Sequence, residues 1–354
     1  MKEVRVELGE RSYIIRVQPG LLDKFAFLLP KASKAAIITD SNVGPLFAER
    51  VKYALTKVEH HQPGVITIPA GDDHKNSETL ATIYDRMFEL GLDRSSLVIA
   101  LGGGVVGDIA GYAAATFMRG IRYVQVPTTL LADVDSSVGG KTGINHPCGK
   151  NMIGAFHQPS AVFIDPAALQ TLPKRELAAG MAEVIKYGVI RDAEFFQFLE
   201  DHAADVRGLQ PDAIQQLIVR CCEIKADVVT ADEREGGVRA ILNYGHTIGH
   251  ALEAITGYSF YRHGEAVAIG MNLAARIACR MGMIAEEMVN RQARLLREFG
   301  LPTEPEPVDK DRLAALLHGD KKARAGRVRF VLPVDIGSVV ISEDVTDEMV
   351  KELF

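Results

Sequence analysis

Short apolar runs bounded by proline, glycine or aspartate recur through the first half of the chain. They predict five buried strands, at residues 35–39, 65–69, 97–101, 123–126 and 161–164. Between the first strands, apolar positions at helical spacing predict helices at 46–57 and at 78–90, and Ser77 is the expected N-cap of the second. Such alternation is typical of a parallel sheet covered by helices. Residues 4–8 and 13–17 predict a hairpin at the edge of that sheet.

The pattern changes near Leu172 and Pro173, after which the apolar positions follow the helical period almost throughout. Helices are predicted at 176–190, 193–205, 211–227, 239–256, 266–281 and 286–299. One late hairpin is expected at 330–333 and 339–341. The 354 residues therefore predict two domains: an α/β domain with a mostly parallel sheet at 1–172, and an all-α domain at 173–354.

Composition and charge narrow the class of protein. Hydrophobic residues make up 47% and charged residues 24%, as in ordinary globular enzymes. The net charge is −6 and no run of basic residues occurs, which argues against nucleic-acid binding. Four cysteines without metal-binding spacing, and an N-terminus without a hydrophobic signal core, favour the cytoplasm. The nearly uncharged stretch at 98–118 is rich in glycine and contains Asp108, so no membrane contact is expected.

A glycine-rich turn joins the strand at 97–101 to a helix-like stretch at 109–117. Its glycines Gly102, Gly104 and Gly107 would let the backbone approach a pyrophosphate, whose charge is attracted by the helix N-terminus. A tight packing turn is the alternative interpretation. The motif does not follow the first strand, and no acid stands about 20 residues further on, so the predicted nucleotide-binding domain is a variant of the Rossmann fold.

A second polar cluster, at 127–145, follows the fourth predicted strand and is rich in hydroxyls and glycines. Together with Lys141, Lys150 and Asn151 it is suited to bind phosphate or carboxylate groups. A solvated surface loop is the alternative. Ligands bind in loops that follow parallel strands, which favours the functional interpretation.

The helical half contains a candidate metal site. His246 and His250 stand four residues apart and so share one helix face. Further ligands are at hand in His263 and Glu183, and two imidazoles with one carboxylate form a familiar catalytic zinc set. Spacing alone does not choose between His246 and His250, and a purely structural role for the pair is the alternative.

Basic residues accompany these motifs in a chain of negative net charge. Together they indicate a cationic site for an anionic substrate; they are Arg119, Lys141, Lys150, Lys186, Lys225, Arg239 and the pair Lys321 and Lys322.

The sequence resembles the 3-dehydroquinate synthase family of sugar phosphate cyclases over nearly its whole length. The resemblance lies in residues 102–108, 127–145, 149–151, 182–188, 232–250 and 263–265. It implies an N-terminal NAD-binding α/β domain, a C-terminal helical domain that binds metal and substrate, and an active site between them. It also implies a homodimer in which Arg119 reaches the neighbouring subunit's site.

Individual roles follow from the same resemblance. The implied ligands of zinc, for which cobalt can substitute, are Glu183, His246 and His263. The catalytic residues are His250, which transfers a proton, with Lys186, Lys150 and Arg239. The NAD contacts are Asp40, Asn42, Asp72, Lys75, Gly103, Gly104, Val105, Val106, Gly107, Asp108, Thr128, Thr129, Lys141, Lys150, Ala168, Leu169, Gln170 and Thr171. The substrate contacts are the metal ligands and catalytic residues together with Arg119, Asp135, Lys141, Asn151, Lys225, Asn243 and Lys321.

The implied reaction is a lyase step of the shikimate pathway. It converts 3-deoxy-D-arabino-heptulosonate 7-phosphate into 3-dehydroquinate and phosphate by transient NAD-dependent oxidation, phosphate elimination, re-reduction and aldol closure. Two positions depart from the family pattern, because Asp72 replaces a more common glutamate and Asp133 a frequent glutamine. The alternatives are a related cyclase for another phosphorylated sugar, and a metal-dependent polyol dehydrogenase of the same fold, which would produce net NADH.

Overall fold

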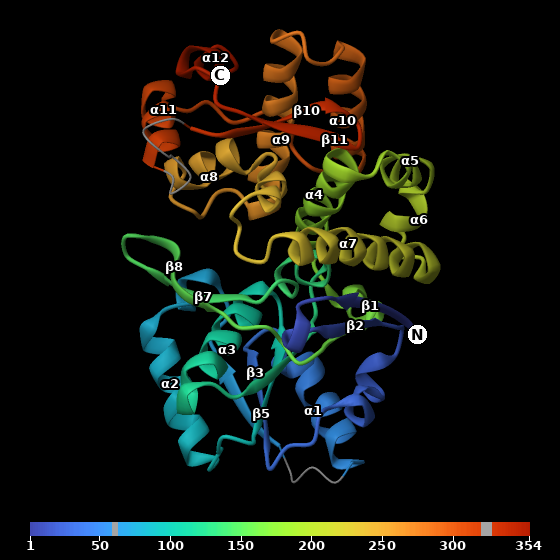
Figure 1. Ribbon diagram of the computed structural model, residues 1–354, viewed down its shortest axis with the longest axis vertical. Coiled ribbons are helices and arrows are strands. Elements are labelled where there is room, and N and C mark those ends of the chain that lie inside the picture. Colours follow the sequence, from blue (N-terminus) through green and yellow to red (C-terminus); the bar gives the residue numbers. More distant parts are fainter. Residues whose placement is uncertain (59–62, 320–327) are drawn as a thin grey trace. The chain divides into compact units, whose positions relative to one another are not determined.

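The computed structural model describes residues 1–58, 63–319 and 328–354. The chain divides into two compact units (Figure 1). The first comprises Met1–Leu172 together with Ile214–Thr230, and the second comprises Pro173–Ala213 and Ala231–Phe354. Most of helix α7 (Pro211–Ala231) therefore packs with the α/β half of the chain.

The first unit contains a seven-stranded sheet in the order β1-β2-β9-β6-β5-β3-β4. Its strands are β1 (Lys2–Val6), β2 (Tyr13–Val17), β3 (Ala35–Asp40), β4 (Gly64–Ile68), β5 (Leu97–Gly102), β6 (Arg122–Pro127) and β9 (Val162–Ile164). Only β1 pairs antiparallel, with β2, at the edge. The mostly parallel sheet, its five predicted strands β3, β4, β5, β6 and β9, and the edge hairpin are thus confirmed.

Helices cover both faces of this sheet because its central strands are apolar on both sides. The side chains of Ile99 and Leu101 in β5 pack with helix α1 (Gly44–Thr56) on one face. Those of Val98 and Ala100 pack on the other face with α2 (Ser77–Glu89) and α3 (Gly104–Thr116). Every residue of β3 and β5 is buried, which explains their continuous apolar runs.

A two-stranded ribbon, β7 (Lys141–His146) with β8 (Gly149–Phe156), was not predicted as strands. Its residues alternate weakly between apolar and polar, and β8 is largely exposed. The pairing depends on glycine: a Cβ on Gly143 would lie 2.5 Å from the Ile153 carbonyl oxygen, and one on Gly154 would lie 2.1 Å from that of Thr142. Close approach of two backbones therefore stabilises a ribbon that hydrophobic patterning does not reveal.

The second unit is helical, with one hairpin, β10 (Phe330–Asp335) with β11 (Ser338–Ser342), as the sequence predicts. Its helices are α4 (Lys174–Arg191), α5 (Ala193–Asp201), α6 (Ala203–Arg207), α8 (His246–Ile255), α9 (His263–Arg280), α10 (Glu286–Glu298), α11 (Lys310–Gly319) and α12 (Asp347–Lys351). Among the described residues, none of the helices is both long and apolar enough to cross a membrane.

Three local predictions are wrong in detail. The expected helix at 193–205 is divided at His202 into α5 and α6. The expected helix at 239–256 is broken into a 3₁₀ turn (Val238–Asn243) and α8, because Gly245 adopts a left-handed φ of +78°. A Cβ on Gly245 would lie 2.7 Å from the carbonyl oxygen of Val267 in α9, so the close approach of α9 sets the break. The N-cap of α2 is Asn76 and not Ser77, since the Asn76 side chain accepts the Thr79 N–H at 3.0 Å.

Candidate active site

The residues implied to bind NAD collect where the parallel strands of the seven-stranded sheet end, along the edge formed by their C-terminal ends. Asp40 ends β3, Lys75 follows β4, Gly103 follows β5 and Thr128 follows β6. Residues 168–171 lie in the 3₁₀ turn that follows β9. Parallel neighbours end at the same edge, so the fold brings these segments together where open α/β sheets bind their ligands.

The N-terminus of α3 is built for close approach by an anion. Gly103 is its N-cap, and no side chain caps the first N–H groups. A Cβ on Gly103 would lie 3.0 Å from Thr129, and one on Gly104 would lie 3.0 Å from Ser136 Oγ. The buried Oγ1 of Thr128 nearby has no hydrogen-bond partner within the described part of the chain. N–H donors without a side-chain cap, at a turn where little room is left for a Cβ, fit the pyrophosphate of a dinucleotide.

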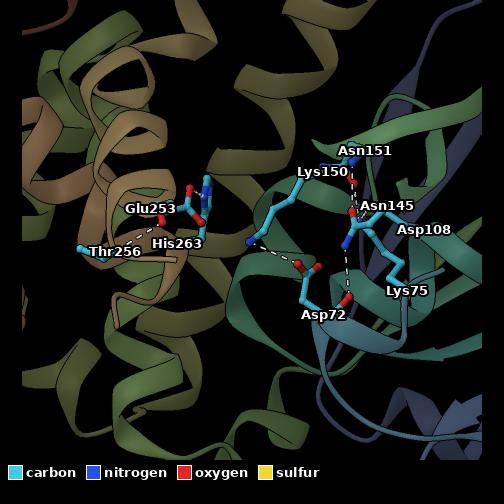
Figure 2. A network of polar contacts seen from close by, with 9 residues as sticks. All are labelled: Asp72, Lys75, Asp108, Asn145, Lys150, Asn151, Glu253, Thr256 and His263. Atoms are coloured by element: carbon cyan, nitrogen blue, oxygen red, sulfur yellow. Dashed lines mark hydrogen bonds and ion pairs between the residues drawn. The ribbon is translucent and has the colours of Figure 1, made fainter. Parts of the chain in front are cut away.

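A buried cation lies at the same edge (Figure 2). Lys75, with 4% of its surface exposed, donates to Asp108 Oδ2 at 2.8 Å and to Asn151 Oδ1 at 2.5 Å. Burial raises the pKa of the Asp108 carboxyl, and the charge and hydrogen bond of Lys75 oppose this increase. Asn151 has a left-handed φ of +54°, a strained backbone that its side-chain bond to Lys75 helps to hold.

Asn145 joins the segments implied to bind NAD and substrate, a role that the sequence analysis missed. Its backbone N–H donates to the Lys75 carbonyl at 2.7 Å, and its Nδ2 donates to the Asp72 carbonyl at 3.1 Å. Its Oδ1 accepts the Asn151 N–H at 2.9 Å. Lys150 lies next in the ribbon and pairs with Asp72 Oδ2 at 3.2 Å (Figure 2). The only sequence signal was the place of Asn145 at the end of the polar cluster.

Helix α7 brings Lys225 into the first unit, where its Nζ donates to Asp135 Oδ1 at 2.7 Å. Near this pair, Cys222 donates its thiol to the Asp133 carbonyl oxygen at 3.4 Å. The Asp133 carboxyl is buried, and neither of its oxygens has a hydrogen-bond partner among the described residues. Burial, reinforced by the charge of Asp165, raises its pKa well above the usual range. Burial therefore favours the uncharged form of this carboxyl group in the core.

The candidate metal ligands meet in the second unit. Glu183 lies in α4, while His246 and His263 are the first residues of α8 and α9. Glu183 Oε1 lies 3.4 Å from His246 Nε2 and 3.7 Å from His263 Nε2. One donor atom from each residue lies within 4.8 Å of the others. The structure thus brings together the three residues that the resemblance implies, and it does so from three separate helices.

The surroundings of Glu183 fit a divalent cation. Its side chain is fully buried, and within the described residues neither carboxylate oxygen has a hydrogen-bond partner, although Lys186 one turn further along α4 forms an ion pair with it. A buried carboxylate is costly unless cations compensate it. Oxygen from one carboxylate and nitrogen from two imidazoles are donors that zinc and cobalt accept.

Hydrogen bonds orient both imidazoles. The Nδ1 of His246 lies 3.0 Å from the Tyr244 carbonyl oxygen, which accepts its proton and leaves Nε2 facing Glu183. The Nδ1 of His263 lies 3.2 Å from Glu253 Oε2 (Figure 2). Burial lowers the pKa of His263, but the hydrogen bond and charge of Glu253 and the charge of Glu183 outweigh this, so the net pKa is raised. Positive charge at His263 is therefore stabilised.

His250 completes a cluster of three imidazoles, with ring centroids 5.4 Å from His246 and 6.0 Å from His263. Donor atoms of His250, Glu253 and His263 also lie within 4.8 Å of one another. Glu253 had no assigned role in the sequence analysis. The helical period offered a signal, because Glu253 follows His246 by seven residues and His250 by three, and so lies on the same face of α8.

Arg239 lies in the 3₁₀ turn that precedes α8 and ends at Asn243, and this turn fixes its guanidinium. Arg239 is 1% exposed and donates from Nη1 to the Glu233 carbonyl at 2.5 Å. The Asp232 carboxylate accepts three backbone N–H groups of the 236–239 turn. Burial raises the pKa of Asp232, but these hydrogen bonds lower it by more, so the net pKa lies below the usual value. The turn thus holds a buried cation whose Nε makes no hydrogen bond among the described residues but lies 3.7 Å from Glu235 Oε1.

The residues implied to bind substrate fall in both units. Asp135, Lys141, Asn151 and Lys225 belong to the first, with Lys150 and Arg119. Arg119 closes the 3₁₀ turn after α3, with a left-handed φ of +67°. The second unit holds Lys186, Arg239, Asn243, His250 and the three candidate ligands. Lys321 and Lys322 lie outside the described residues.

The fold and the solved structures that it matches place the chain among the sugar phosphate cyclases. A 2-epi-5-epi-valiolone synthase from Streptomyces hygroscopicus subsp. jinggangensis, solved with NAD+ and Zn2+ bound, matches with a TM-score of 0.90 and 32% identity over 98% of this chain and 97% of its own. A 2-deoxy-scyllo-inosose synthase, solved with carbaglucose-6-phosphate, NAD+ and Co2+, matches with a TM-score of 0.91 and 28% identity over 99% of this chain and 98% of its own.

Sequence comparison is more specific. The family models described as 3-dehydroquinate synthase N-terminal and C-terminal match residues 65–179 and 180–323. A 3-dehydroquinate synthase of Prochlorococcus marinus (strain AS9601) is 48% identical over 360 residues, covering 100% of this chain and 99% of its own. The chain belongs to the 3-dehydroquinate synthase family.

Proposed function

We propose that this chain converts 3-deoxy-D-arabino-heptulosonate 7-phosphate into 3-dehydroquinate and phosphate, using NAD and a divalent metal ion. Family membership supports the reaction. The observation that carries the proposal is the convergence of Glu183, His246 and His263, whose donor atoms lie within 4.8 Å of one another. Lys186 pairs with Oε2 of this fully buried carboxylate, while Oε1 faces the two imidazoles and would be the oxygen that holds the cation.

The first unit would hold NAD, which supplies a temporary acceptor for a hydride and ends the cycle unchanged. The N–H groups at the start of α3 would bind its pyrophosphate, with Gly103 and Gly104 allowing the approach. Asp40 Oδ1 accepts the N–H groups of Asn42 and Val43 at 2.8 and 2.9 Å, and so shapes the loop that would face the cofactor. Asp72, one methylene shorter than the usual glutamate, would still offer a carboxylate.

The second unit would hold zinc, or cobalt in its place, through Glu183, His246 and His263; such an ion makes a bound hydroxyl easier to deprotonate. His250 stands beside the ligands and would take up and return the hydroxyl proton. Lys186, paired with Glu183, would add a further positive charge near the bound substrate. These groups would stabilise negative charge where it develops.

Cationic and polar residues would hold the carboxylate and the phosphate of the substrate. Arg239 is suited to the carboxylate because its buried guanidinium makes no hydrogen bond from Nε among the described residues, where Glu235 Oε1 lies 3.7 Å away. The remaining proposed contacts are Asp135, Lys141, Lys150, Asn151, Lys225, Asn243 and Lys321. Held at both ends, the substrate chain is oriented for phosphate to leave and for its own carbonyl to be attacked during ring closure.

We also propose a homodimer in the cytoplasm, with Arg119 contributed to the neighbouring subunit's site. Arg119 forms no side-chain hydrogen bond or ion pair with the described residues and follows Met118, which also has a left-handed φ, of +51°. Two adjacent strained residues that present an uncommitted cation support a role outside this subunit. Cys148, Cys221, Cys222 and Cys279 form no disulfide among the described residues, which is compatible with the proposed compartment.

Purified protein supplied with the substrate, NAD and zinc tests the proposed reaction. We expect one phosphate released per substrate consumed, with 3-dehydroquinate formed and no accumulation of NADH. NADH produced in proportion to substrate would instead identify a polyol dehydrogenase. The matched variant Glu183→Gln keeps the size of the side chain and should release no phosphate above background.

A further inference from the structure

The buried carboxylate of Glu253 contacts His263, one of the three candidate metal ligands. Its side chain is 4% exposed, and Oε2 lies 3.2 Å from His263 Nδ1, on the side of the ring opposite to Nε2 (Figure 2). We infer that Glu253 is a positioning residue that fixes the tautomer and orientation of His263 and strengthens it as a metal ligand. The inference rests on the proposed metal site and extends it to a residue outside the ligand set.

The geometry supports this role because the two nitrogens of His263 face two different carboxylates. Nε2 lies 3.7 Å from Glu183 Oε1, and Nδ1 faces Glu253. A carboxylate can only accept from Nδ1, so the proton is held there and the lone pair of Nε2 is directed at the ion. A hydrogen-bonded carboxylate also increases the electron density of the imidazole, which strengthens metal binding.

The two imidazole ligands differ in how they are oriented. His246 donates to the backbone carbonyl of Tyr244, two residues before it, so its orientation is set by the fold of its own turn. His263 begins α9, and its partner Glu253 comes from α8. A side chain therefore does for His263 what the backbone does for His246. The orientation of His263 can therefore be changed by replacing the side chain of Glu253, whereas the backbone partner of His246 cannot be replaced in this way.

An alternative role for Glu253 is that of a direct ligand, since His250, Glu253 and His263 also have donor atoms within 4.8 Å of one another. We favour the positioning role because Glu253 faces Nδ1, while Nε2 of the same ring faces Glu183, which lacks hydrogen bonds among the described residues. A ligand role for Glu253 would require a second ion, and this can be counted.

The test compares the metal affinity of wild-type apoprotein with that of Glu253→Ala, Glu253→Gln and the control Thr256→Val, using zinc and a competing chelator. Loss of a carboxylate partner of a metal-bound histidine typically costs about 10- to 100-fold in affinity, and we expect this for Glu253→Ala. Glu253→Gln keeps an acceptor without the charge and should fall between Glu253→Ala and wild type. Thr256→Val removes only hydroxyl bonds to the Leu252 and Glu253 carbonyls and should bind like wild type.

A second readout separates positioning from general damage. With cobalt bound, we expect the visible absorption spectrum of Glu253→Ala to change, while its far-ultraviolet circular dichroism stays as in wild type. If Glu253→Ala does not fold, Glu253→Gln decides, since it is nearly isosteric. Affinity and spectrum equal to wild type in the variant that folds would overturn the inference and leave the proposed function standing.

Stoichiometry distinguishes the remaining outcomes. We expect one zinc ion per chain in wild type, and one in Glu253→Gln at saturation. Two ions in wild type, with one lost in the variants, would make Glu253 a ligand and overturn the positioning role. No zinc bound by the wild type would remove the proposed metal site and the inference with it.

Discussion

Gly264, the second residue of α9, lies where that helix touches α4 most closely. A Cβ on Gly264 would lie 1.9 Å from the Ala179 carbonyl oxygen, 2.5 Å from its carbonyl carbon and 2.6 Å from its Cα. The first distance is about 1.5 Å short of ordinary van der Waals contact. All three atoms belong to the backbone of α4, so no side-chain rotation can relieve the clash. We therefore expect Gly264→Ala to force α4 and α9 apart.

The expected magnitude is the difference between two opposing effects. Alanine is favoured over glycine within a helix by about 1 kcal/mol. Overpacking costs about 1–3 kcal/mol, and more where backbone must move. We expect a net loss of about 2 kcal/mol in the free energy of unfolding. The same displacement would separate Glu183 in α4 from His263 in α9. A shift near 1 Å far exceeds the roughly 0.2 Å tolerance of metal–ligand distances. Zinc affinity should therefore fall at least tenfold.

Urea denaturation of the apoprotein and chelator competition for zinc measure the two effects separately. Gly236→Ala is the control, because its Cβ would meet nothing nearer than Asp232 Oδ1 at 3.8 Å, and its unfolding free energy should stay within about 0.5 kcal/mol of wild type. Stability and zinc affinity of Gly264→Ala equal to those of wild type would refute the close packing of α4 against α9.

Three further predictions concern other parts of the two units. Asp133→Asn should be more stable than wild type at neutral and alkaline pH. Because the pKa of Asp133 is raised in the folded state, the free energy of unfolding of the wild type is highest below the pKa that Asp133 has in the unfolded chain. It then falls with rising pH, by at most about 1.4 kcal/mol per pH unit. Unfolding free energies that run parallel between pH 4 and 9 in the two proteins would contradict this. Asn145→Ala should weaken NAD and substrate binding together, because Asn145 bonds both the 72–75 segment and Asn151; calorimetry showing only one of them affected would argue against the coupling. His250→Ala should lower kcat by about 10²- to 10⁴-fold at unchanged zinc content, and loss of zinc on elemental analysis would make His250 a ligand instead.

Strong burial made the sheet predictable from sequence. β5 is buried along its whole length and followed by a glycine turn, so its apolar run, its end and the helix after it all carry local signals. The segment after β6 was assigned to ligand binding because ligands bind in loops that follow parallel strands. The site residues after β3 and β4 were implied only by the family resemblance.

Features that depend on contacts between distant segments were not predictable. The left-handed Gly245 that starts α8 is set by Val267 and Met271 in α9, 22 and 26 residues further along the chain. Spacing within α8 left His246 and His250 equivalent as ligands, because the choice depends on Glu183 in α4 and on the Tyr244 carbonyl. The β7–β8 ribbon depends on two glycines that meet across it. Asn145 and Glu253 act through partners that no local pattern identifies.

The most direct test of the proposed site is a zinc-edge anomalous difference map from crystals of the protein grown with zinc. We predict one peak per chain, about 2.0–2.2 Å from a Glu183 oxygen and from the Nε2 atoms of His246 and His263. A peak bound by His250 and Glu253, or no peak at Glu183, would contradict the assignment of these three residues as the ligands.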